Sequence, residues 1–158
     1  MSLKRPANRS GPPPDRNGSS GISALRPQLH SSDQRRRRIL LVEGNPAIAQ
    51  LYQSMLEPSF DVAIEGNPLS ALTILSSAKV GYDLVLCDVE IPGVSGFEFV
   101  RRMKLDSAAT RVPVVLFNGE EESAQVIRAI QLGVRHYIPK TCSLGDLTRK
   151  ISALLSPR

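Results

Sequence analysis

The chain has 158 residues, which is enough for one ordinary domain and too few for two. Hydrophobic residues (41%) and charged residues (22%) are close to the globular average, and two distant cysteines exclude a disulfide scaffold and favour a reducing cytosol. The apolar runs are much shorter than the roughly 20 residues of a membrane helix, which excludes a transmembrane helix. No apolar stretch follows the first basic residues, so the N-terminus is not a secretory signal. The Cys and His residues form no zinc motif.

The net charge of +5 is unevenly distributed along the chain. Residues 1–38 contain nine basic and two acidic residues, whereas residues 39–158 contain eleven basic and thirteen acidic ones. The basic character therefore belongs to the N-terminal segment, and the mildly acidic remainder argues against a core that binds nucleic acid.

Residues 1–34 are rich in Pro, Gly, Ser, Asn and Arg and show no apolar periodicity, so they cannot bury enough surface to offset the entropy of ordering. Four consecutive arginines, Arg35 to Arg38, end this segment. We predict a disordered basic leader over residues 1–38 and one domain over residues 39–156. We interpret the arginines as a solvated tail, with nucleic acid, an anionic lipid surface or an acidic partner as open alternatives.

From Ile39 onward, strand patterns alternate with helix patterns. Runs that are apolar on both faces predict central strands at 39–42, 84–87 and 112–117, and weaker strands follow at 60–64 and 136–138. Amphipathic patterns predict helices near 48–55, 67–78, 95–105, 121–132 and 144–155. Pro46 and Pro68 suit first helical turns, and Gly133 suits the end of the fourth helix. Five strand–helix units predict an α/β fold, a doubly wound parallel sheet with helices on both faces.

Polar residues stand at the predicted carboxyl ends of four strands, which meet at one edge of such a sheet. Glu43 follows strand one, and Asp88 follows strand three. Asn118 follows strand four, and Lys140 follows strand five. This set suits a phosphoryl group: Asp88 would be the nucleophile that forms an acyl phosphate, and Lys140 would neutralise phosphoryl oxygens. A hard divalent cation such as Mg²⁺ would bridge carboxylate and phosphoryl oxygens.

These residues resemble a known family: segment 39–155 is similar to the receiver domains of bacterial two-component response regulators. Asp88, Pro92 and Gly96 form the family's D-x-x-x-P-x-x-x-G loop. Four further positions match the family by their distance along the chain: Glu43, Asn118, Lys140 and the aromatic Tyr137.

The resemblance implies a flavodoxin-like fold with strand order 2-1-3-4-5, and the transfer of a phosphoryl group to Asp88 from a histidine kinase or a phosphotransfer protein. It implies Mg²⁺ bound by Glu43 and Asp88. Lys140 would contact the phosphoryl group. Asn118 would contact it too, although Asn118-Gly119 could instead be merely a turn dipeptide. Tyr137 would be the signalling switch, although it could also be an ordinary edge-strand aromatic. A bacterial cytoplasmic location, and no enzymatic activity beyond autocatalytic phosphotransfer, follow from the same resemblance.

Three positions depart from the family pattern. The second of two adjacent acids after strand one is replaced by Gly44, so we expect weak Mg²⁺ binding unless Glu90, otherwise an exposed loop acid, supplies the missing carboxylate. Asn118 stands where the family has Thr or Ser. Thr141 replaces the proline that normally follows the lysine, so we expect a trans Lys140–Thr141 peptide bond.

Two further features have structural interpretations. Glu120, Glu121 and Glu122 are expected to begin the fourth helix, where carboxylates suit the helix dipole, although Glu120 could instead shape access to the pocket. Cys87, inside strand three, is expected to be a small buried hydrophobe.

Only three residues follow the last predicted helix, so we expect a stand-alone receiver without an output domain. Its signal would then pass through a protein contact. The resemblance assigns this contact to helix four, strand five and helix five, a face that carries Arg128, Arg135 and Tyr137.

Two functional hypotheses remain open. Asp88 and Lys140 favour a phosphorylatable switch that uses Mg²⁺. Gly44 and Asn118 favour a degenerate receiver, or pseudo-receiver, that acts as an interaction module without phosphorylation. A flavin or nucleotide enzyme on the same fold is disfavoured, because no glycine-rich phosphate loop follows strand one.

Overall fold

A computed structural model describes residues 35–77, 79, 81–119 and 123–157. Most of the predicted leader, residues 1–34, lies outside the described residues, and so does the acidic run Glu120 to Glu122. Among the described residues, none of the helices has the length and apolar character that a bilayer-spanning segment needs.

Five strands and five α-helices alternate along the described chain. The strands are β1 (Arg38–Val42), β2 (Asp61–Glu65), β3 (Leu84–Asp88), β4 (Val114–Asn118) and β5 (His136–Pro139). The helices are α1 (Pro46–Leu56), α2 (Pro68–Ser76), α3 (Gly96–Leu105), α4 (Ser123–Gln131) and α5 (Leu144–Leu155), with a short 3₁₀ turn at Ala109–Arg111. All strand pairs are parallel and the order is β2-β1-β3-β4-β5, which confirms the predicted fold and topology.

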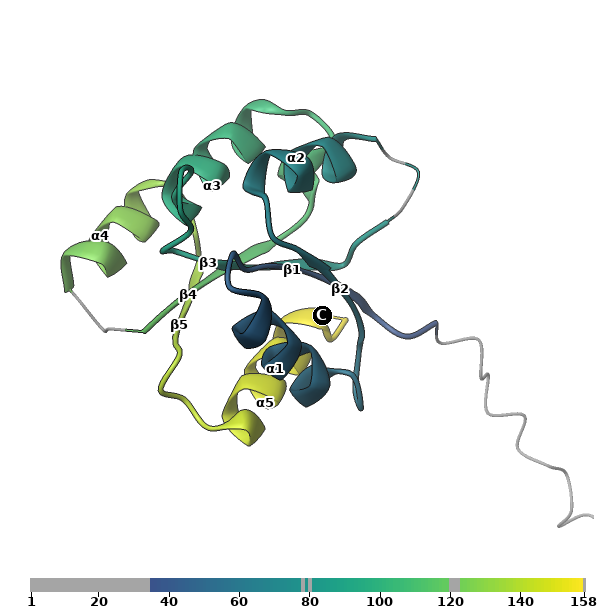
Figure 1. Cartoon of the computed structure of the whole chain (residues 1–158). Coiled ribbons are helices and arrows are strands. Elements are labelled where there is room, and N and C mark those ends of the chain that lie inside the picture. Colours follow the sequence, from purple (N-terminus) through teal and green to yellow (C-terminus); the bar gives the residue numbers. More distant parts are fainter. Residues whose placement is uncertain (1–34, 78, 80, 120–122, 158) are drawn as a thin grey trace, which may run out of the picture. The chain divides into compact units, whose positions relative to one another are not determined.

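The sheet separates two helical layers (Figure 1): α1 and α5 cover one face, and α2, α3 and α4 cover the other. Side chains of the central strands alternate between the layers, so these strands are apolar on both faces. On β1, Leu40 and Val42 pack in the layer of α2 and α3, whereas Ile39 and Leu41 pack in the layer of α1 and α5. None of these four residues is more than 1% exposed.

Local signals in the sequence fix several helix ends. Asn45 and Asn67 cap α1 and α2 by accepting hydrogen bonds from two backbone N–H groups each, and Pro46 and Pro68 occupy the first turns as predicted. Gly133 has a φ of 73°, and the N–H of the next residue, Val134, bonds back to the end of α4, as in a Schellman motif.

The loop between β3 and α3 is held close to the sheet by Gly96. Its N–H donates to the carbonyl of Val89 at 2.9 Å. A Cβ at this position would lie 2.3 Å from the carbonyl oxygen of Asp88, so only glycine allows the loop to approach so closely. This contact fixes the backbone from which the Asp88 side chain projects.

The four arginines contact the folded unit at the amino end of the sheet instead of forming the solvated tail that we expected. Arg35 and Arg37 each lie 3.2 Å from one carboxylate oxygen of Asp83, and the backbone N–H of Arg38 donates to the other at 2.7 Å. Arg36 donates to the carbonyl oxygens of Glu57 and Phe60 at the end of α1. This follows from the register of the sheet, because Asp83 directly precedes β3, the neighbour of β1.

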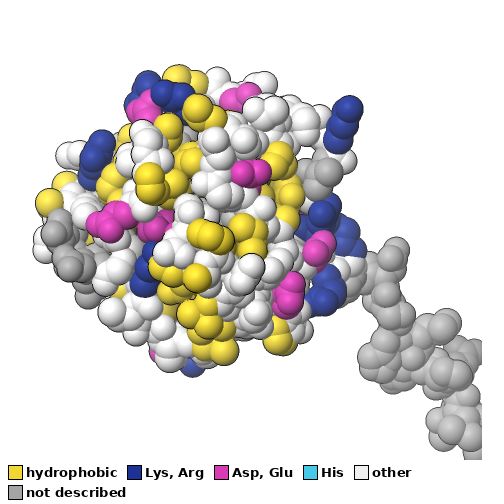
Figure 2. All heavy atoms as spheres, in the orientation of Figure 1, with side chains coloured by type: hydrophobic (Ala, Val, Ile, Leu, Met, Phe, Trp, Pro, Cys, Tyr) yellow, Lys and Arg dark blue, Asp and Glu magenta, His cyan; other side chains and the backbone are white. Residues whose placement is uncertain are grey.

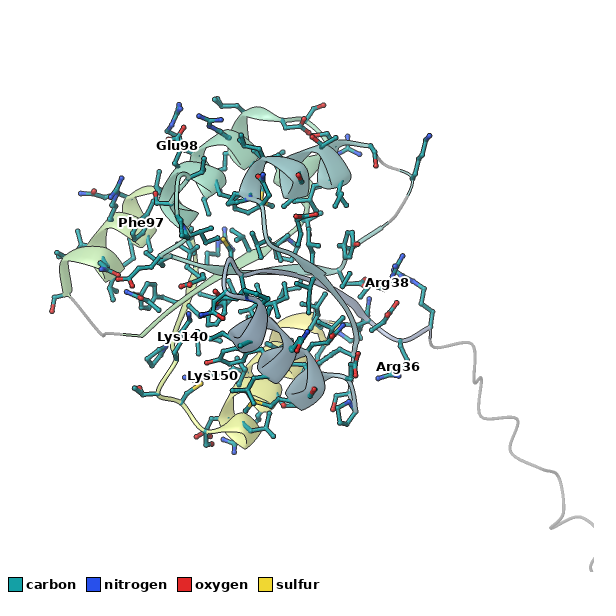
Figure 3. All side chains as sticks on the ribbon, viewed as in Figure 1. Arg36, Arg38, Phe97, Glu98, Lys140 and Lys150 are labelled. Carbon is teal, nitrogen blue, oxygen red and sulfur yellow. The ribbon has the colours of Figure 1, made fainter. Side chains whose placement is uncertain are left out.

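Arg36 and Arg38 lie at the end of the sheet opposite Lys140 (Figure 3). Basic and acidic side chains stand next to one another where the described chain begins (Figure 2). β1 itself starts at Arg38, one residue before the boundary expected from the change in composition.

Asp83→Ala should lower the free energy of unfolding by about 1–3 kcal/mol, because it leaves the Arg38 N–H and two arginine side chains without their acceptor. The Asp83 side chain is only 12% exposed. Asp61→Ala is the matched control, since Asp61 is 54% exposed and pairs with one arginine, an arrangement that contributes about 0–1 kcal/mol. Urea unfolding of the full chain measures both, and an equal loss in the two variants would contradict the anchoring role of Asp83.

Gly96→Ala should destabilise the chain by about 1–3 kcal/mol, because the added methyl group must displace the Asp88 backbone. Gly145→Ala is the control: a Cβ there meets nothing within 4 Å, so the change should be neutral or slightly stabilising. Thermal unfolding of both variants checks this, and an unchanged melting temperature in Gly96→Ala would refute the close approach.

Candidate functional site

Four polar side chains converge at the carboxyl ends of the strands. Glu43 follows β1, Asp88 ends β3, Asn118 ends β4 and Lys140 follows β5. Glu43 and Asp88 are each 3% exposed and Asn118 is 1% exposed, so these are the buried polar residues of the described chain. The predicted edge of the sheet therefore carries a sheltered cluster of charges and amides, which we call the rim site.

The ammonium group of Lys140 binds both carboxylates of the rim site. Its Nζ lies 2.9 Å from Oδ2 of Asp88 and 3.0 Å from Oε2 of Glu43 (Lys140 is labelled in Figure 3). The second oxygen of each carboxylate accepts a backbone N–H, from Asn45 to Glu43 at 2.9 Å and from Glu90 to Asp88 at 3.2 Å. Every carboxylate oxygen of the pair is thus held in a fixed direction.

Lys140 is protonated at neutral pH despite its partial burial. Burial by itself would lower the pKa of its ammonium group, but the hydrogen bonds and charges of Asp88 and Glu43 outweigh that effect and raise the pKa above its ordinary value. The Nζ also lies 4.8 Å from the ring centroid of Phe117, so the cation makes a cation–π contact with this ring. The rim site therefore holds a cation between two carboxylate side chains.

Cys87 is not a second nucleophile. Burial, followed by the nearby Asp88 and Glu43 charges, raises the pKa of its thiol well above the ordinary value, so the thiolate does not form at neutral pH. Cys87 is fully buried in the core, which confirms the prediction of a small buried hydrophobe.

Asn118 and Tyr137 share a partner that the sequence analysis missed. Asn118 Nδ2 donates a hydrogen bond to Oε1 of Gln125, and the Tyr137 hydroxyl donates to the same oxygen at 3.2 Å. The helical spacing could have indicated this role for Gln125. Gln125 lies four residues before the buried Ala129, so Gln125 is a polar residue on the inward face of α4. The backbone also ties Asn118 to the rim site, since the Lys140 N–H donates to its carbonyl oxygen at 2.6 Å.

The donor set suits a hard cation but is small. Glu43 and Asp88 supply buried carboxylate oxygens, and Mg²⁺ in proteins often uses one or two carboxylates while keeping several waters. Within the described ranges, no group of three Asp, Glu, His or Cys side chains is arranged to hold a metal ion. Glu90 is exposed, and it contacts Asp88 through its backbone N–H.

Gly44 and Thr141, the other two positions that depart from the family pattern, both lie in the described part of the chain. A Cβ on Gly44 would lie 3.2 Å from Ile91 Cγ2 and from Pro92 Cδ, so the loop after β3 packs tightly against this position. The Lys140–Thr141 peptide bond is trans, as predicted, since the described chain has no cis bond.

Comparisons with known proteins identify the family of the chain. Residues 39–152 match the family model of the response regulator receiver domain. The DNA-binding response regulator MtrA of Mycolicibacterium smegmatis is 30% identical over 124 residues, which cover 78% of this chain and 52% of that protein. The transcriptional regulatory protein YkoG of Bacillus subtilis is 33% identical over 118 residues, which cover 74% of this chain and 50% of that protein. The chain thus spans about half the length of the curated relatives it matches.

Solved structures share the fold. The chemotaxis protein CheY4 of Vibrio cholerae superposes with a TM-score of 0.68 at 20% identity, covering 76% of this chain and 99% of that one. The receiver domain of the sensor histidine kinase PA1611 of Pseudomonas aeruginosa, which has a magnesium ion coordinated in its active-site cleft, gives a TM-score of 0.68 at 22% identity and covers 77% and 98%. With the family match over residues 39–152, these findings establish that the chain belongs to the response regulator receiver domain family of two-component signalling.

Proposed function

We propose that this chain is a receiver that accepts a phosphoryl group on Asp88 from a histidine kinase or a phosphotransfer protein, and that it signals in the cytoplasm by protein contact. The observation that carries the proposal is the buried Asp88 carboxylate, held by the Lys140 ammonium group at 2.9 Å. A nucleophilic carboxylate beside a fixed cation, at the carboxyl edge of a parallel sheet, is the arrangement that phosphoryl transfer to a side chain requires.

In the proposed reaction, a carboxylate oxygen of Asp88 attacks the phosphorus of a phosphohistidine. A phosphorus–oxygen bond forms, the phosphorus–nitrogen bond breaks, and the imidazole leaves with its electron pair and takes up a proton. Lys140 neutralises charge on the phosphoryl oxygens, and the Glu90 N–H keeps the carboxylate oriented. Asn118 offers amide hydrogens at the neighbouring strand end.

Mg²⁺ is the cation that we propose for the rim site. Glu43 and Asp88 would hold it, and a bound divalent ion supplies charge neutralisation for phosphoryl oxygens. The magnesium ion of the PA1611 receiver domain supports this assignment by analogy of fold. The net negative charge left after pairing with Lys140 attracts the ion only weakly, because Gly44 contributes no carboxylate.

The proposed output surface is the face formed by α4, β5 and α5. Ile127 and Ile130 on α4 are 55% and 65% exposed, which supports a contact with a protein partner. Arg128 lies over the ring of Phe97 on α3, and Arg135, directly before β5, is exposed, so the proposed surface also carries positive charge. Arg35, Arg37 and Arg38 are paired with acids of the folded unit, which disfavours them as a nucleic-acid site.

A degenerate receiver is the second candidate function. The specific observation in its favour is that Lys140 already pairs with both carboxylates of the rim site, while Gly44 and Asn118 lack the groups that the family uses at those positions. Such a chain would bind its partner without phosphorylation through the same face. The two candidates differ in whether Asp88 forms an acyl phosphate.

Intact mass spectrometry of the full chain after incubation with acetyl phosphate and Mg²⁺ should reveal one added phosphoryl group. Asp88→Asn should abolish the adduct, because the amide is no longer a nucleophile. Asp61→Asn is the matched control: Asp61 is an exposed acid at the amino end of β2, and the adduct should persist. An unmodified wild-type chain would instead support the degenerate receiver, and an adduct that survives in Asp88→Asn would assign the acceptor elsewhere.

Gly44→Asp should bind Mg²⁺ at least about tenfold more tightly than the wild type, a gain of about 1.4 kcal/mol from one more carboxylate. Gly44→Ala separates this effect from crowding, because its methyl group meets Ile91 and Pro92 without adding charge. Calorimetric titration with MgCl₂ measures the affinities. Equal affinity in wild type and Gly44→Asp would refute the prediction, and weaker binding in Glu90→Gln would identify Glu90 as the source of the missing carboxylate.

A further inference from the structure

A cavity lies at the amino ends of β4 and β5, at the end of the sheet opposite the rim site. Its volume is about 380 Å³, within the range of roughly 300–1,000 Å³ that is typical of small-molecule pockets. The end of α3, the chain from Thr110 to Val114, the chain from Gly133 to His136 and the end of α5 surround it. None of the rim-site residues lines this cavity, which we call the basal cavity.

One wall of the basal cavity is apolar. Val100 and Met103 on α3 are 0% and 2% exposed. Val114 and Leu154 are partly buried and pack against the core on the two faces of the sheet. Pro113 has no backbone N–H, so it brings no hydrogen-bond donor to this wall. A ligand with an apolar body would remove the exposed part of these side chains from water, which is a favourable transfer.

Two cations lie at the border of the same cavity. A Cβ on Gly133 would lie 3.5 Å from Nζ of Lys104 and 3.7 Å from its Cε, so the Lys104 side chain lies over the turn that ends α4. Arg135 follows this turn and is exposed. Within the described ranges, neither cation takes part in an ion pair. No Asp or Glu is among the described residues that line the cavity.

We propose that the basal cavity binds a small amphipathic anion, an apolar body that carries one carboxylate. The apolar body packs against Val100, Met103 and Val114. The carboxylate pairs with Lys104 and Arg135, because it offsets the repulsion between two like charges and because a guanidinium group can hold both carboxylate oxygens. The proposal does not involve Asp88, so it is independent of the proposed phosphorylation.

The division of the cavity into an apolar wall and a cationic border limits the class of ligand. A ligand with several charges would press charge against the apolar wall, where an ion without a partner is strongly disfavoured. A neutral apolar ligand would cover the wall but would leave Lys104 and Arg135 without a counter-ion. A monocarboxylate with an apolar body satisfies both parts of the cavity.

Octanoate is a suitable probe, with 1-octanol and acetate as controls. Octanol has the same chain without the charge, and acetate has the charge without the chain. In the full chain, octanoate should produce saturable shifts of the backbone amide resonances of Thr110, Val114 and Gly133. Octanol should bind at least about threefold more weakly, the effect of a partly exposed charge pair, and acetate should give no saturable shift.

Lys104→Gln should weaken octanoate binding by about three- to tenfold and leave octanol binding unchanged, because it removes the charge and keeps a long side chain over Gly133. Arg135→Gln should give a similar loss. Arg111→Gln is the matched control: Arg111 is an exposed cation next to Thr110 but does not line the cavity. In about 0.15 M salt, which screens distant charges, the affinity of this control should change by less than about twofold.

The position of the shifts separates the basal cavity from its neighbours. A cavity of about 340 Å³ shares Arg135 with it, but that cavity is lined by Tyr137 and Lys150 and not by Lys104 (Lys150 is labelled in Figure 3). Shifts centred on Lys150 or on the rim site would overturn the proposal. Equal affinities for octanoate and octanol, an unchanged affinity in Lys104→Gln, or no saturable shift at all would overturn it as well. Since no phosphodonor is present, none of these outcomes bears on the phosphorylation of Asp88.

Discussion

The rim site depends on one ammonium group. Lys140 binds Asp88, which lies 52 residues earlier in the chain, and Glu43, which lies 97 residues earlier. Two carboxylates that are each 3% exposed would otherwise repel one another without full hydration, so the cation is what permits both to be charged in this place. Their convergence follows from a parallel sheet, in which the carboxyl ends of β1, β3 and β5 share one edge.

The aliphatic core gives this charge cluster a rigid base. Strands β1, β3 and β4 are apolar on both faces. Phe117 on β4 lies under the Lys140 cation, and the ring of Tyr52 packs edge-on against the ring of Phe117. Within the described part of the chain, every buried side-chain nitrogen or oxygen has a hydrogen-bond partner. The site therefore has little freedom to rearrange without exchanging one hydrogen bond for another.

Electrostatics also organise the opposite end of the sheet. Asp83 binds the backbone N–H of Arg38 and the side chains of Arg35 and Arg37, so a carboxylate there has a role comparable to that of Lys140 at the rim site. The excess of positive charge before residue 39 is thus partly neutralised by acids of the folded unit. Composition alone could not reveal this, because the pairing depends on which loop ends beside β1.

The sequence by itself predicted five strand–helix units, helices on both faces of a parallel sheet and the convergence of Glu43, Asp88, Asn118 and Lys140, because hydrophobic periodicity and the rules of parallel sheets are local or topological. The strand order came from the resemblance to receiver domains. The boundaries moved by one or two residues: β4 begins at Val114, after a proline that has no N–H to donate.

Only the tertiary structure decided how the side chains pair. That one ammonium group holds both carboxylates, that Gln125 joins Asn118 to Tyr137, and that the arginines bind Asp83 are all contacts between residues far apart or on different elements. Hydrogen bonds and ion pairs depend on distances of a few tenths of an ångström, which side-chain packing fixes and which spacing along the chain does not.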